Sequence, residues 1–542
     1  MRGGTLRLNL MGRKMITPVT QPPVSGGCNA KTTRSLVRPN SSAPLFSTFR
    51  TARRLAGAVR AAAFAFVAGA LLISPTWAEM PAFRWASRAG GNGHDYGTGI
   101  AVDSEGNTYI CGYFRGQARF EDTGLAGKGE ADIFLAKYNR VGQLVWVRQA
   151  GGSADDFARA VAIDAEGNCY LTGSFQSPSI DFGGDPVKRN SDSEIFVAKF
   201  DGQGKVLWVR QAGGGSGGGG SGNGLTIAAD GAVYVCGYFN GDIVFNDLTL
   251  KNAGFNDIFV ARYDAAGELD WVRQIGGAGD DAASAIVVDA QGNAYITGGF
   301  EEDVRFSRTI TLSSSGLVDS FVAKLDNTGR TVWAQHAGGP NVDIGYSLGL
   351  DPHGNVIVSG GFNGTESFAS EMRLHAAFRS RKGTHTGNFS GKGLRSVGGS
   401  DVFVSKYDQR GRLTWVRTFG GNKIGAPEAG YGMAVDASGH THVTGTFAGR
   451  ADFGNNTLFS MGIGDVFVTE LDREGRVIWA RQAGAQFSEP IAGHALAVDR
   501  GGNTYVVGYY RGNINFGDHV LKSLGETDIF VTKITAQIAP RR

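Results

Sequence analysis

A tryptophan recurs along the chain at nearly constant intervals, and this repetition constrains the fold more than any other feature of the sequence. Seven tryptophans follow one another at spacings of 61, 62, 63, 62, 82 and 64 residues. They are Trp85, Trp146, Trp208, Trp271, Trp333, Trp415 and Trp479. A fixed period of this length indicates a repeat architecture, in which one structural unit is written several times. The 542 residues therefore predict one domain of repeats, although length alone would allow three or four domains.

Each unit contains four short apolar segments, as the second copy illustrates. They are the Trp segment Leu144–Gly152, a segment ending in Asp at Ala160–Asp164, a segment with Gly-x-Phe at Asn168–Phe175, and Glu194–Phe200. Asp-x-x-Gly turns separate the segments, because Asp accepts hydrogen bonds from its own turn and Gly adopts the positive φ that closes a hairpin. Four short strands in seven copies, without helical periodicity, predict an all-β, seven-bladed β-propeller with four-stranded blades.

The two ends of the chain are complementary incomplete units. Phe83–Ala89 is a Trp strand without the rest of a unit, and the last unit stops after the strand Asp528–Lys533. We expect the N-terminal Trp strand to pair with the C-terminal blade and close the ring, because closure hides two strand edges that would otherwise be exposed.

The units resemble the bacterial seven-bladed propeller repeat of the SBBP type, whose pattern combines W…GG, IAVDxxGNxYxxGxF and DxFVAKYDxxG. The resemblance covers Phe83–Ile534 and implies a propeller that is exported and acts as a binding or scaffold module without a shared catalytic motif. Three copies depart from the pattern. Ala228 and Ala232 replace the turn Asp and Asn in the third copy, His440 replaces the turn Asn in the sixth, and Tyr510 replaces the Phe in the seventh.

Residues that recur in all seven copies are expected to serve the unit itself, since a ring usually needs a given functional site once. We expect the tryptophans and the phenylalanines of Gly-x-Phe and Asp-x-Phe to pack between blades. The same expectation holds for the acid that opens the last strand of each copy. These acids are Asp132, Glu194, Asp257, Asp319, Asp401, Asp465 and Asp528.

The first 78 residues have the composition of an export leader. Residues 1–78 hold 11 Lys or Arg and no Asp or Glu, and Ala61–Ile73 is an uncharged apolar run of 13 residues. A basic stretch, an apolar run and small residues at Thr76 and Ala78 are typical of a secretory signal peptide that is cleaved after Ala78. The apolar run is short for a membrane span, which needs ~20 residues.

The stretch before this signal is long for a secretory peptide, so an over-called translation start before Pro44 is one interpretation. An organellar transit peptide and twin-arginine export at Arg53-Arg54 are two others. Export predicts a mature chain of residues 79–542 without a transmembrane anchor, secreted or located in the periplasm or on the cell surface of a bacterium.

The charge of the mature chain differs from that of the leader. Residues 79–542 hold 42 Lys or Arg and 50 Asp or Glu, a net charge of −8. An acidic body lacks the basic surface that nucleic-acid binding needs, so no nucleic-acid partner is predicted.

One insertion, at about residues 370–396, causes the 82-residue spacing and carries six basic residues against Glu371. They are Arg373, Arg379, Arg381, Lys382, Lys392 and Arg395. A basic loop on an acidic body is either a solvated surface loop or a docking site for an anionic partner, such as a protein or a cell-envelope polymer.

The loop after the Gly-Gly pair carries an acid in four copies. These acids are Asp95, Asp156, Asp281 and Asp343. We expect their loops on one face of the ring near its centre, where four carboxylates could bind a hard cation such as Ca²⁺. The alternative is an Asp that caps its own loop through backbone amides. No other cofactor is predicted.

Catalytic motifs are scarce, because the sequence contains no Gly-x-Ser-x-Gly elbow, P-loop or Cys-x-x-Cys. The Asp-x-x-Gly-x-x-x-Trp run, as at Asp201–Trp208, is similar to the tryptophan-docking repeat of pyrroloquinoline-quinone dehydrogenases. That resemblance implies a quinoprotein-like enzyme as the alternative, although those enzymes are eight-bladed and usually carry a vicinal cysteine pair. The sequence favours a non-catalytic, exported propeller that binds a protein or an envelope polymer, in an oligomeric state that the sequence leaves open.

Overall fold

The computed structural model describes residues 81–214, 217–363, 371–372, 394–396, 399–423, 428–460, 462–484 and 491–536. Chain contacts separate residues 1–77 from a compact unit that begins at residue 78. The predicted leader and signal peptide lie outside the described residues. All elements in the described part are β-strands, and no helix there has the length and apolarity to span a membrane.

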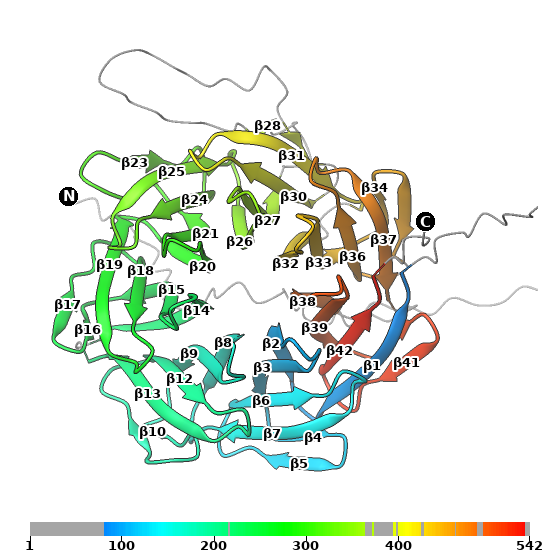
Figure 1. Cartoon of the computed structure of the whole chain (residues 1–542), viewed down its shortest axis with the longest axis horizontal. Coiled ribbons are helices and arrows are strands. Elements are labelled where there is room, and N and C mark those ends of the chain that lie inside the picture. The colour runs from blue at the N-terminus through cyan, green and yellow to red at the C-terminus, as the bar shows by residue number, and fades with distance from the viewer. Residues whose placement is uncertain are drawn as a thin grey trace, which may run out of the picture. The chain divides into compact units, whose positions relative to one another are not determined.

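Seven antiparallel sheets form a ring around a central axis (Figure 1). From the axis outwards, blade one contains β2 (Tyr96–Val102), β3 (Thr108–Phe114), β6 (Asp132–Tyr138) and β7 (Leu144–Ala150). Blade two contains β8 (Asp156–Ile163), β9 (Cys169–Phe175), β12 (Glu194–Phe200) and β13 (Val206–Gly213). Blade three contains β14 (Gly219–Ile227), β15 (Val233–Asn240), β18 (Asp257–Tyr263) and β19 (Leu269–Gly277). Blade four contains β20 (Ala282–Val288), β21 (Ala294–Phe300), β24 (Asp319–Leu325) and β25 (Thr331–Ala337).

The remaining blades repeat this order. Blade five contains β26 (Asp343–Leu350), β27 (Val356–Asn363), β30 (Ser400–Tyr407) and β31 (Leu413–Phe419). Blade six contains β32 (Ala429–Val435), β33 (Thr441–Phe447), β36 (Asp465–Leu471) and β37 (Val477–Ala483). Blade seven contains β38 (Ile491–Val498), β39 (Thr504–Tyr510), β42 (Asp528–Ile534) and, as its fourth strand, β1 (Phe83–Gly91). The all-β, seven-bladed propeller predicted from the sequence is therefore confirmed.

The first strand of the chain lies beside the last one. β1 pairs antiparallel with β42, with Ala86 opposite Thr532 and Arg88 opposite Phe530. Blade seven is thus assembled from both ends of the described chain, and neither end leaves an open edge of the ring.

Short hairpins lie between the second and third strands of each blade, and the sequence patterns did not predict them. Three of them extend the outer edge of the preceding blade: β4 (Gln117–Phe120) and β5 (Thr123–Ala126) on β1, β16 (Ile243–Phe245) and β17 (Leu248–Leu250) on β13, and β22 (Asp303–Arg305) and β23 (Thr311–Ser313) on β19. The others are two-stranded sheets of their own: β10 (Ser179–Ile180) with β11 (Val187–Lys188), β28 (Glu371–Met372) with β29 (Leu394–Arg395), β34 (Arg450–Phe453) with β35 (Asn456–Phe459), and β40 (Asn513–Phe516) with β41 (His519–Lys522).

The tryptophans join neighbouring blades, as expected. A Cβ at Gly411, whose φ is +77°, would lie 2.7 Å from the Trp333 ring, so the indole lies flat on the turn of the next blade. The Trp333 Nε1 also donates to the carbonyl oxygen of Gln409 in that turn (3.1 Å). Glycine is required in this Asp-x-x-Gly turn for its left-handed backbone and for the room it leaves to the ring.

The first glycine of each Gly-Gly pair lies against the acid that opens the third strand of the same blade. A Cβ at Gly276 would lie 1.9 Å from Asp257 Oδ1, and one at Gly151 would lie 1.6 Å from Asp132 Oδ1. Both carboxylates are fully buried. The first glycine of the pair therefore recurs because a buried carboxylate occupies the space of its side chain.

We predict that Gly276→Ala destabilises the protein, because the added methyl group must displace a buried and hydrogen-bonded carboxylate. Overpacking of this kind costs about 1–3 kcal/mol, measured as the free energy of unfolding in urea. The matched control is Gly124→Ala in β5, where an added Cβ meets no heavy atom within 4 Å, and its effect should stay within about 0.5 kcal/mol. Equal stability of the two variants would contradict the prediction.

Candidate functional site

The four acids of the Gly-Gly loops lie at or directly before the first residue of the innermost strands and are buried there. Asp343 Oδ2 accepts a hydrogen bond from the Gly339 amide (2.6 Å), and its Oδ1 accepts one from the Asn363 amide (3.1 Å). Asp95, Asp156 and Asp281 accept the corresponding pair of amides, one from the preceding blade and one from their own blade. Each carboxylate therefore clamps the outer strand of one blade to the two inner strands of the next.

These hydrogen bonds have the geometry of loop capping, and each of the four acids belongs to a separate blade. In the described part of the chain, the one group of three or more His, Cys, Asp or Glu side chains with converging ligand atoms is formed by other residues, in blade six. The calcium site predicted at Asp95, Asp156, Asp281 and Asp343 stays a prediction.

Blade six carries a fifth acid of this kind that the sequence analysis missed. Glu428 Oε2 accepts from the Gly421 amide (2.7 Å), and Oε1 accepts from the Ala448 amide (3.1 Å). The acid follows its glycine by seven residues in this loop, against four residues at Asp343. The longer side chain of Glu reaches the same place from a longer loop, so a search at fixed spacing does not find it.

These clamping acids have raised pKa values. Burial raises the pKa of Asp95, Asp281 and Asp343 to about 7 and that of Glu428 to about 8, although hydrogen bonds from backbone amides lower each of them. The acid that opens the third strand of the preceding blade lies close enough to raise each pKa further. These neighbours are Asp528, Asp257, Asp319 and Asp401, respectively.

We predict that the free energy of unfolding falls as the pH rises from about 6.5 to about 8. A carboxyl group whose pKa is raised by folding keeps a proton that the unfolded chain has lost, so its stabilising contribution is present below pH ~4 and disappears as the pH passes the folded pKa. Burial lowers the pKa of His494 to about 4 from 6.5, and its contribution is already complete above pH 6.5. Urea unfolding at a series of pH values measures the slope.

Asp343→Asn should reduce the slope of the free energy of unfolding against pH by the contribution of one titrating group, because the amide of Asn does not titrate. The matched control is Asp122→Asn, whose side chain is fully exposed and which should leave the slope unchanged. A slope of zero in the unmodified chain, or an equal slope in Asp343→Asn, would contradict the assignment.

Every innermost strand contains a β-bulge at the same place, and the side chain at the bulge differs from blade to blade. The register of β2 with β3 shifts between Gly97 and Gly99, which leaves Thr98 as the extra residue. The corresponding residues of blades two to seven are Arg159, Asn223, Ser284, Tyr346, Tyr431 and His494. We call these seven residues the bulge belt. The innermost strands surround the axis in Figure 1, so the belt follows the inner wall of the ring.

Neighbouring belt residues contact one another. The Tyr431 ring lies 5.1 Å from the Tyr346 ring and is stacked on the His494 ring at 6.0 Å. On the polar side, Thr98 Oγ1 donates to the Ala158 carbonyl oxygen of blade two (2.9 Å). Thr98 is buried and the other six are partly exposed, so the belt combines an aromatic part and a polar part that solvent can reach.

The first turn of most blades holds a second recurring group, which we call the turn node. In blade seven, Asp499 Oδ2 accepts from Asn503 Nδ2 (2.8 Å) and from the Tyr505 hydroxyl (3.0 Å). Lys533 Nζ lies 3.7 Å from Asp499 Oδ2 and 4.8 Å from the centre of the Tyr505 ring. Blades one, two and four hold the same four residue types at these places. Each regular node therefore pairs one partly buried carboxylate with one ammonium group.

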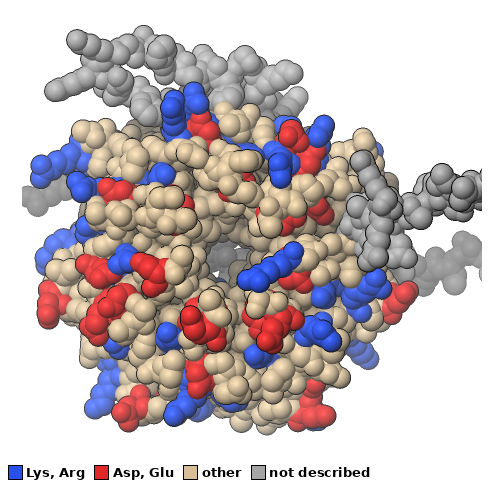
Figure 2. All heavy atoms as spheres, in the orientation of Figure 1, with Lys and Arg blue, Asp and Glu red and all other residues tan. Residues whose placement is uncertain are grey.

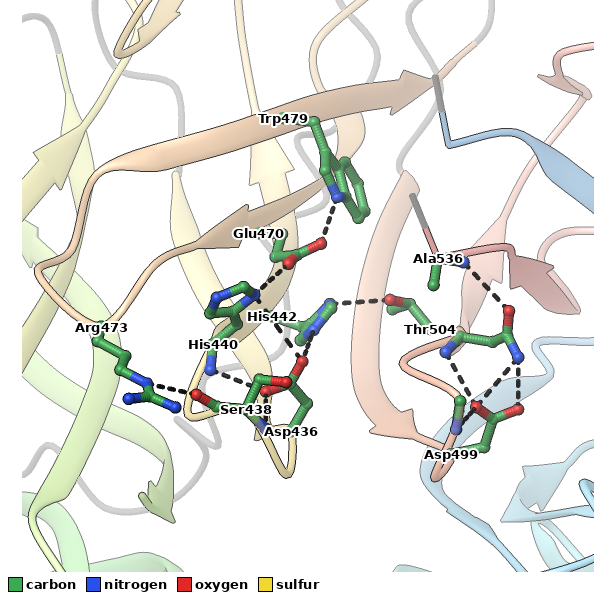
Figure 3. A network of polar contacts seen from close by, with 12 residues as sticks. Asp436, Ser438, His440, His442, Glu470, Arg473, Trp479, Asp499, Thr504 and Ala536 are labelled. Carbon is green, nitrogen blue, oxygen red and sulfur yellow. Dashed lines mark hydrogen bonds and ion pairs between the residues drawn. The ribbon is translucent and has the colours of Figure 1, made fainter. Parts of the chain in front are cut away.

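Blade six replaces three of the four node residues (Figure 3). Asp436 is retained, His440 replaces the Asn, His442 replaces the Tyr, and Glu470 replaces the Lys. Asp436, His442 and Glu470 place one ligand atom each within 4.8 Å of one another. Only His440 was recognised from the sequence as a departure from the repeat pattern, and comparing all four node positions across the copies would have found His442 and Glu470.

The predicted docking residues of the insertion lie almost entirely outside the described residues. This holds for Arg373, Arg379, Arg381, Lys382 and Lys392. The backbone of Arg395 pairs with Glu371 in the small sheet β28–β29.

The fold and its recurring groups define a propeller that is built from one repeated unit. The family model of the beta-propeller repeat SBBP matches residues 84–113, 145–174 and 270–298. The chain therefore carries SBBP repeats, as the resemblance in its sequence implied.

Two curated relatives are similar to this chain. An uncharacterized WD repeat-containing protein of Acanthamoeba polyphaga mimivirus is 24% identical over 533 residues, which cover 80% of this chain and 36% of that protein. The regulatory protein FlaEY of Caulobacter vibrioides is 29% identical over 173 residues, which cover 31% of this chain and 18% of that protein. The chain thus spans about a third or less of the length of these relatives.

Solved structures show more remote likeness. A variant of puromycin hydrolase is 13% identical, with 79% of this chain and 54% of that chain covered and a TM-score of 0.37. The calcium-binding protein regucalcin of Agrobacterium tumefaciens is 11% identical, with 71% and 92% covered and a TM-score of 0.27. Similarities of this size carry no argument about activity.

Proposed function

We propose that the chain is an exported, non-catalytic β-propeller that acts as a binding or structural module for a protein or a cell-envelope polymer of a bacterium. The bulge belt is the observation that carries this proposal. The backbone repeats seven times at this position, yet the side chain there is different in nearly every blade. A regular scaffold that displays a varied row of side chains is the usual design of a recognition surface in repeat proteins.

The residue types of the belt support contact with a large partner. Tyr346 and Tyr431 are aromatic residues of intermediate exposure, and the Arg159 guanidinium lies 5.1 Å from the centre of the Phe157 ring. Tyr and Arg are enriched among the residues that dominate binding energies at interfaces.

Charge supports a partner other than nucleic acid. Figure 2 shows Lys and Arg intermingled with Asp and Glu over the visible face of the ring. The basic insertion at about residues 370–396 is the strongest charge contrast in the mature sequence. We include it in the proposal as a second contact, for an anionic partner.

The quinoprotein-like alternative rests on the Asp-x-x-Gly-x-x-x-Trp run. In this chain six of the seven indoles contact the turn glycine of the next blade, as between Trp333 and Gly411. Packing between blades explains the motif without a cofactor. A dye-linked dehydrogenase assay after loading with pyrroloquinoline quinone and calcium should give no activity, and substrate-dependent dye reduction would contradict the proposal.

We predict that replacing the belt residues Arg159, Tyr346 and Tyr431 together by Ser weakens binding to purified envelope material at least about tenfold, since each change removes a contact worth roughly 1 kcal/mol or more. Ser is the residue that blade four carries at this position, as Ser284, so the fold should tolerate it. Co-sedimentation with envelope fractions measures binding.

Two further chains complete this test. The matched control carries Ser at Val145, Leu207 and Val332, which are about half exposed on the outer strands and should leave binding unchanged. A chain lacking residues 370–396 tests the insertion. The proposal fails if the unmodified chain does not bind, or if the belt variant and the shortened chain both bind as well as the unmodified chain does.

A further inference from the structure

We propose that the turn node of blade six is a binding site for a divalent transition metal of the zinc type, with Asp436, His442 and Glu470 as ligands and His440 as a fourth.

The comparison between blades is the first argument. In the regular node an Asp carboxylate faces a Lys ammonium group, so the charges cancel, as between Asp499 and Lys533. In blade six the Lys position holds Glu470, and the Asn and Tyr positions hold two imidazoles. The three changes together remove the cation and leave two carboxylates and two nitrogen ligands. A bound divalent cation restores the balance that Lys provides elsewhere.

The geometry of His442 is the second argument. This side chain is 1% exposed, and its Nε2 has no hydrogen-bond partner among the described residues. The Nε2 lies 3.7 Å from Asp436 Oδ2. An unsatisfied buried nitrogen is costly, and a metal ion between the imidazole and the carboxylate would satisfy it.

His440 approaches the same point from the turn. Its Nδ1 lies 2.7 Å from Glu470 Oε1 and 3.9 Å from Asp436 Oδ2. The side chain is 32% exposed, so an ion can reach the cluster from solvent past His440. Separations of this size contract to a tetrahedral zinc site by small side-chain movements, since zinc binds N and O ligands at about 2.0–2.2 Å.

Surrounding residues hold the ligands in place (Figure 3). The Thr504 hydroxyl of blade seven lies 2.9 Å from His442 Nδ1. When Nδ1 donates its hydrogen to that hydroxyl, the lone pair of Nε2 points to the carboxylates. Trp479 Nε1 donates to Glu470 Oε2 (2.5 Å).

This indole contact is peculiar to blade six among the tryptophans whose hydrogen bonds are described. Four other blades direct the same indole to a backbone carbonyl oxygen of the next blade, at Gly202, Asn327, Gln409 and Arg473. In blade six the Trp instead orients a proposed ligand, which is the arrangement expected around a metal ion.

The ligand types select the metal. Imidazole nitrogen with carboxylate oxygen suits zinc and its first-row neighbours, whereas Ca²⁺ and Mg²⁺ prefer oxygen ligands alone. This site is therefore distinct in chemistry and in residues from the calcium site predicted at the Gly-Gly loops.

The test uses the full chain, stripped of metal with a chelator and titrated with Zn²⁺ alone in a calorimeter. The comparison variant combines His440→Asn, His442→Tyr and Glu470→Lys, which gives blade six the node of blades one, two, four and seven and should therefore fold. We expect the unmodified chain to bind one more zinc ion than this variant. Zinc should raise the melting temperature of the unmodified chain, and Co²⁺ should give a visible absorption band that the variant lacks.

Two single variants sharpen the result. Thr504→Val removes a partner of His442 and should weaken zinc binding about 10–100-fold. His336→Gln changes another buried histidine that faces an acid, 3.0 Å from Asp319 Oδ2, to the residue that four other blades carry there, and should leave zinc binding unchanged. His375 and His385, which lie outside the described residues, are present in all these chains. Any zinc that they bind therefore does not change the difference in stoichiometry between the unmodified chain and its variants.

Equal zinc stoichiometry and equal thermal response in the unmodified chain and the triple variant would overturn the proposal. The histidines of blade six would then serve as hydrogen-bond partners of the two carboxylates. Binding of Ca²⁺ with the same loss in the triple variant, and without binding of Zn²⁺, would also overturn the assignment of the metal.

Discussion

The ring depends on buried carboxylates that clamp five of the crossings from one blade to the next. At each crossing the chain passes from the outermost strand of one blade to the innermost strand of the following one, and six of the seven crossings carry a Gly-Gly pair. In five crossings an acid at the start of the inner strand accepts two backbone amides, one from each of the two blades that meet there. Buried amides without acceptors are costly, so these carboxylates hold the blades at a fixed distance and angle.

The same arrangement allows side chains to vary between blades at other positions of the scaffold. Glycines pack against one carboxylate and donate to another, and Trp rings lie on the turns of the next blade, so the contacts between blades are made by residues that recur. The bulge residues and the residues of the turn node take no part in the carboxylate clamps at the crossings. They can therefore vary in single blades, and blade six shows how far such variation goes, from a charge-balanced node to two carboxylates and two imidazoles.

Features that repeat along the sequence could be predicted from it, whereas features that depend on contacts in space could not. The Trp spacing and the Asp-x-x-Gly turns predicted the number and the composition of the blades, because each strand is about seven residues long and repeats. The outer hairpins were missed, since strands such as Ser179–Ile180 are too short for a pattern. Glu428 was missed because its loop is longer, although its carboxylate occupies the same place as that of Asp343.

The sequence by itself determined the class of fold, because hydrophobic periodicity and turn chemistry are local properties that seven copies make unmistakable. Only the tertiary structure decided which side chains act together. His442 and Glu470 are 28 positions apart in the sequence, yet they are direct partners in the register of β33 with β36. The bulge residues meet only because the ring brings seven innermost strands to one axis. Chemistry in this protein depends on contacts between strands and between blades, and such contacts exist only after the sheets have paired and the ring has formed.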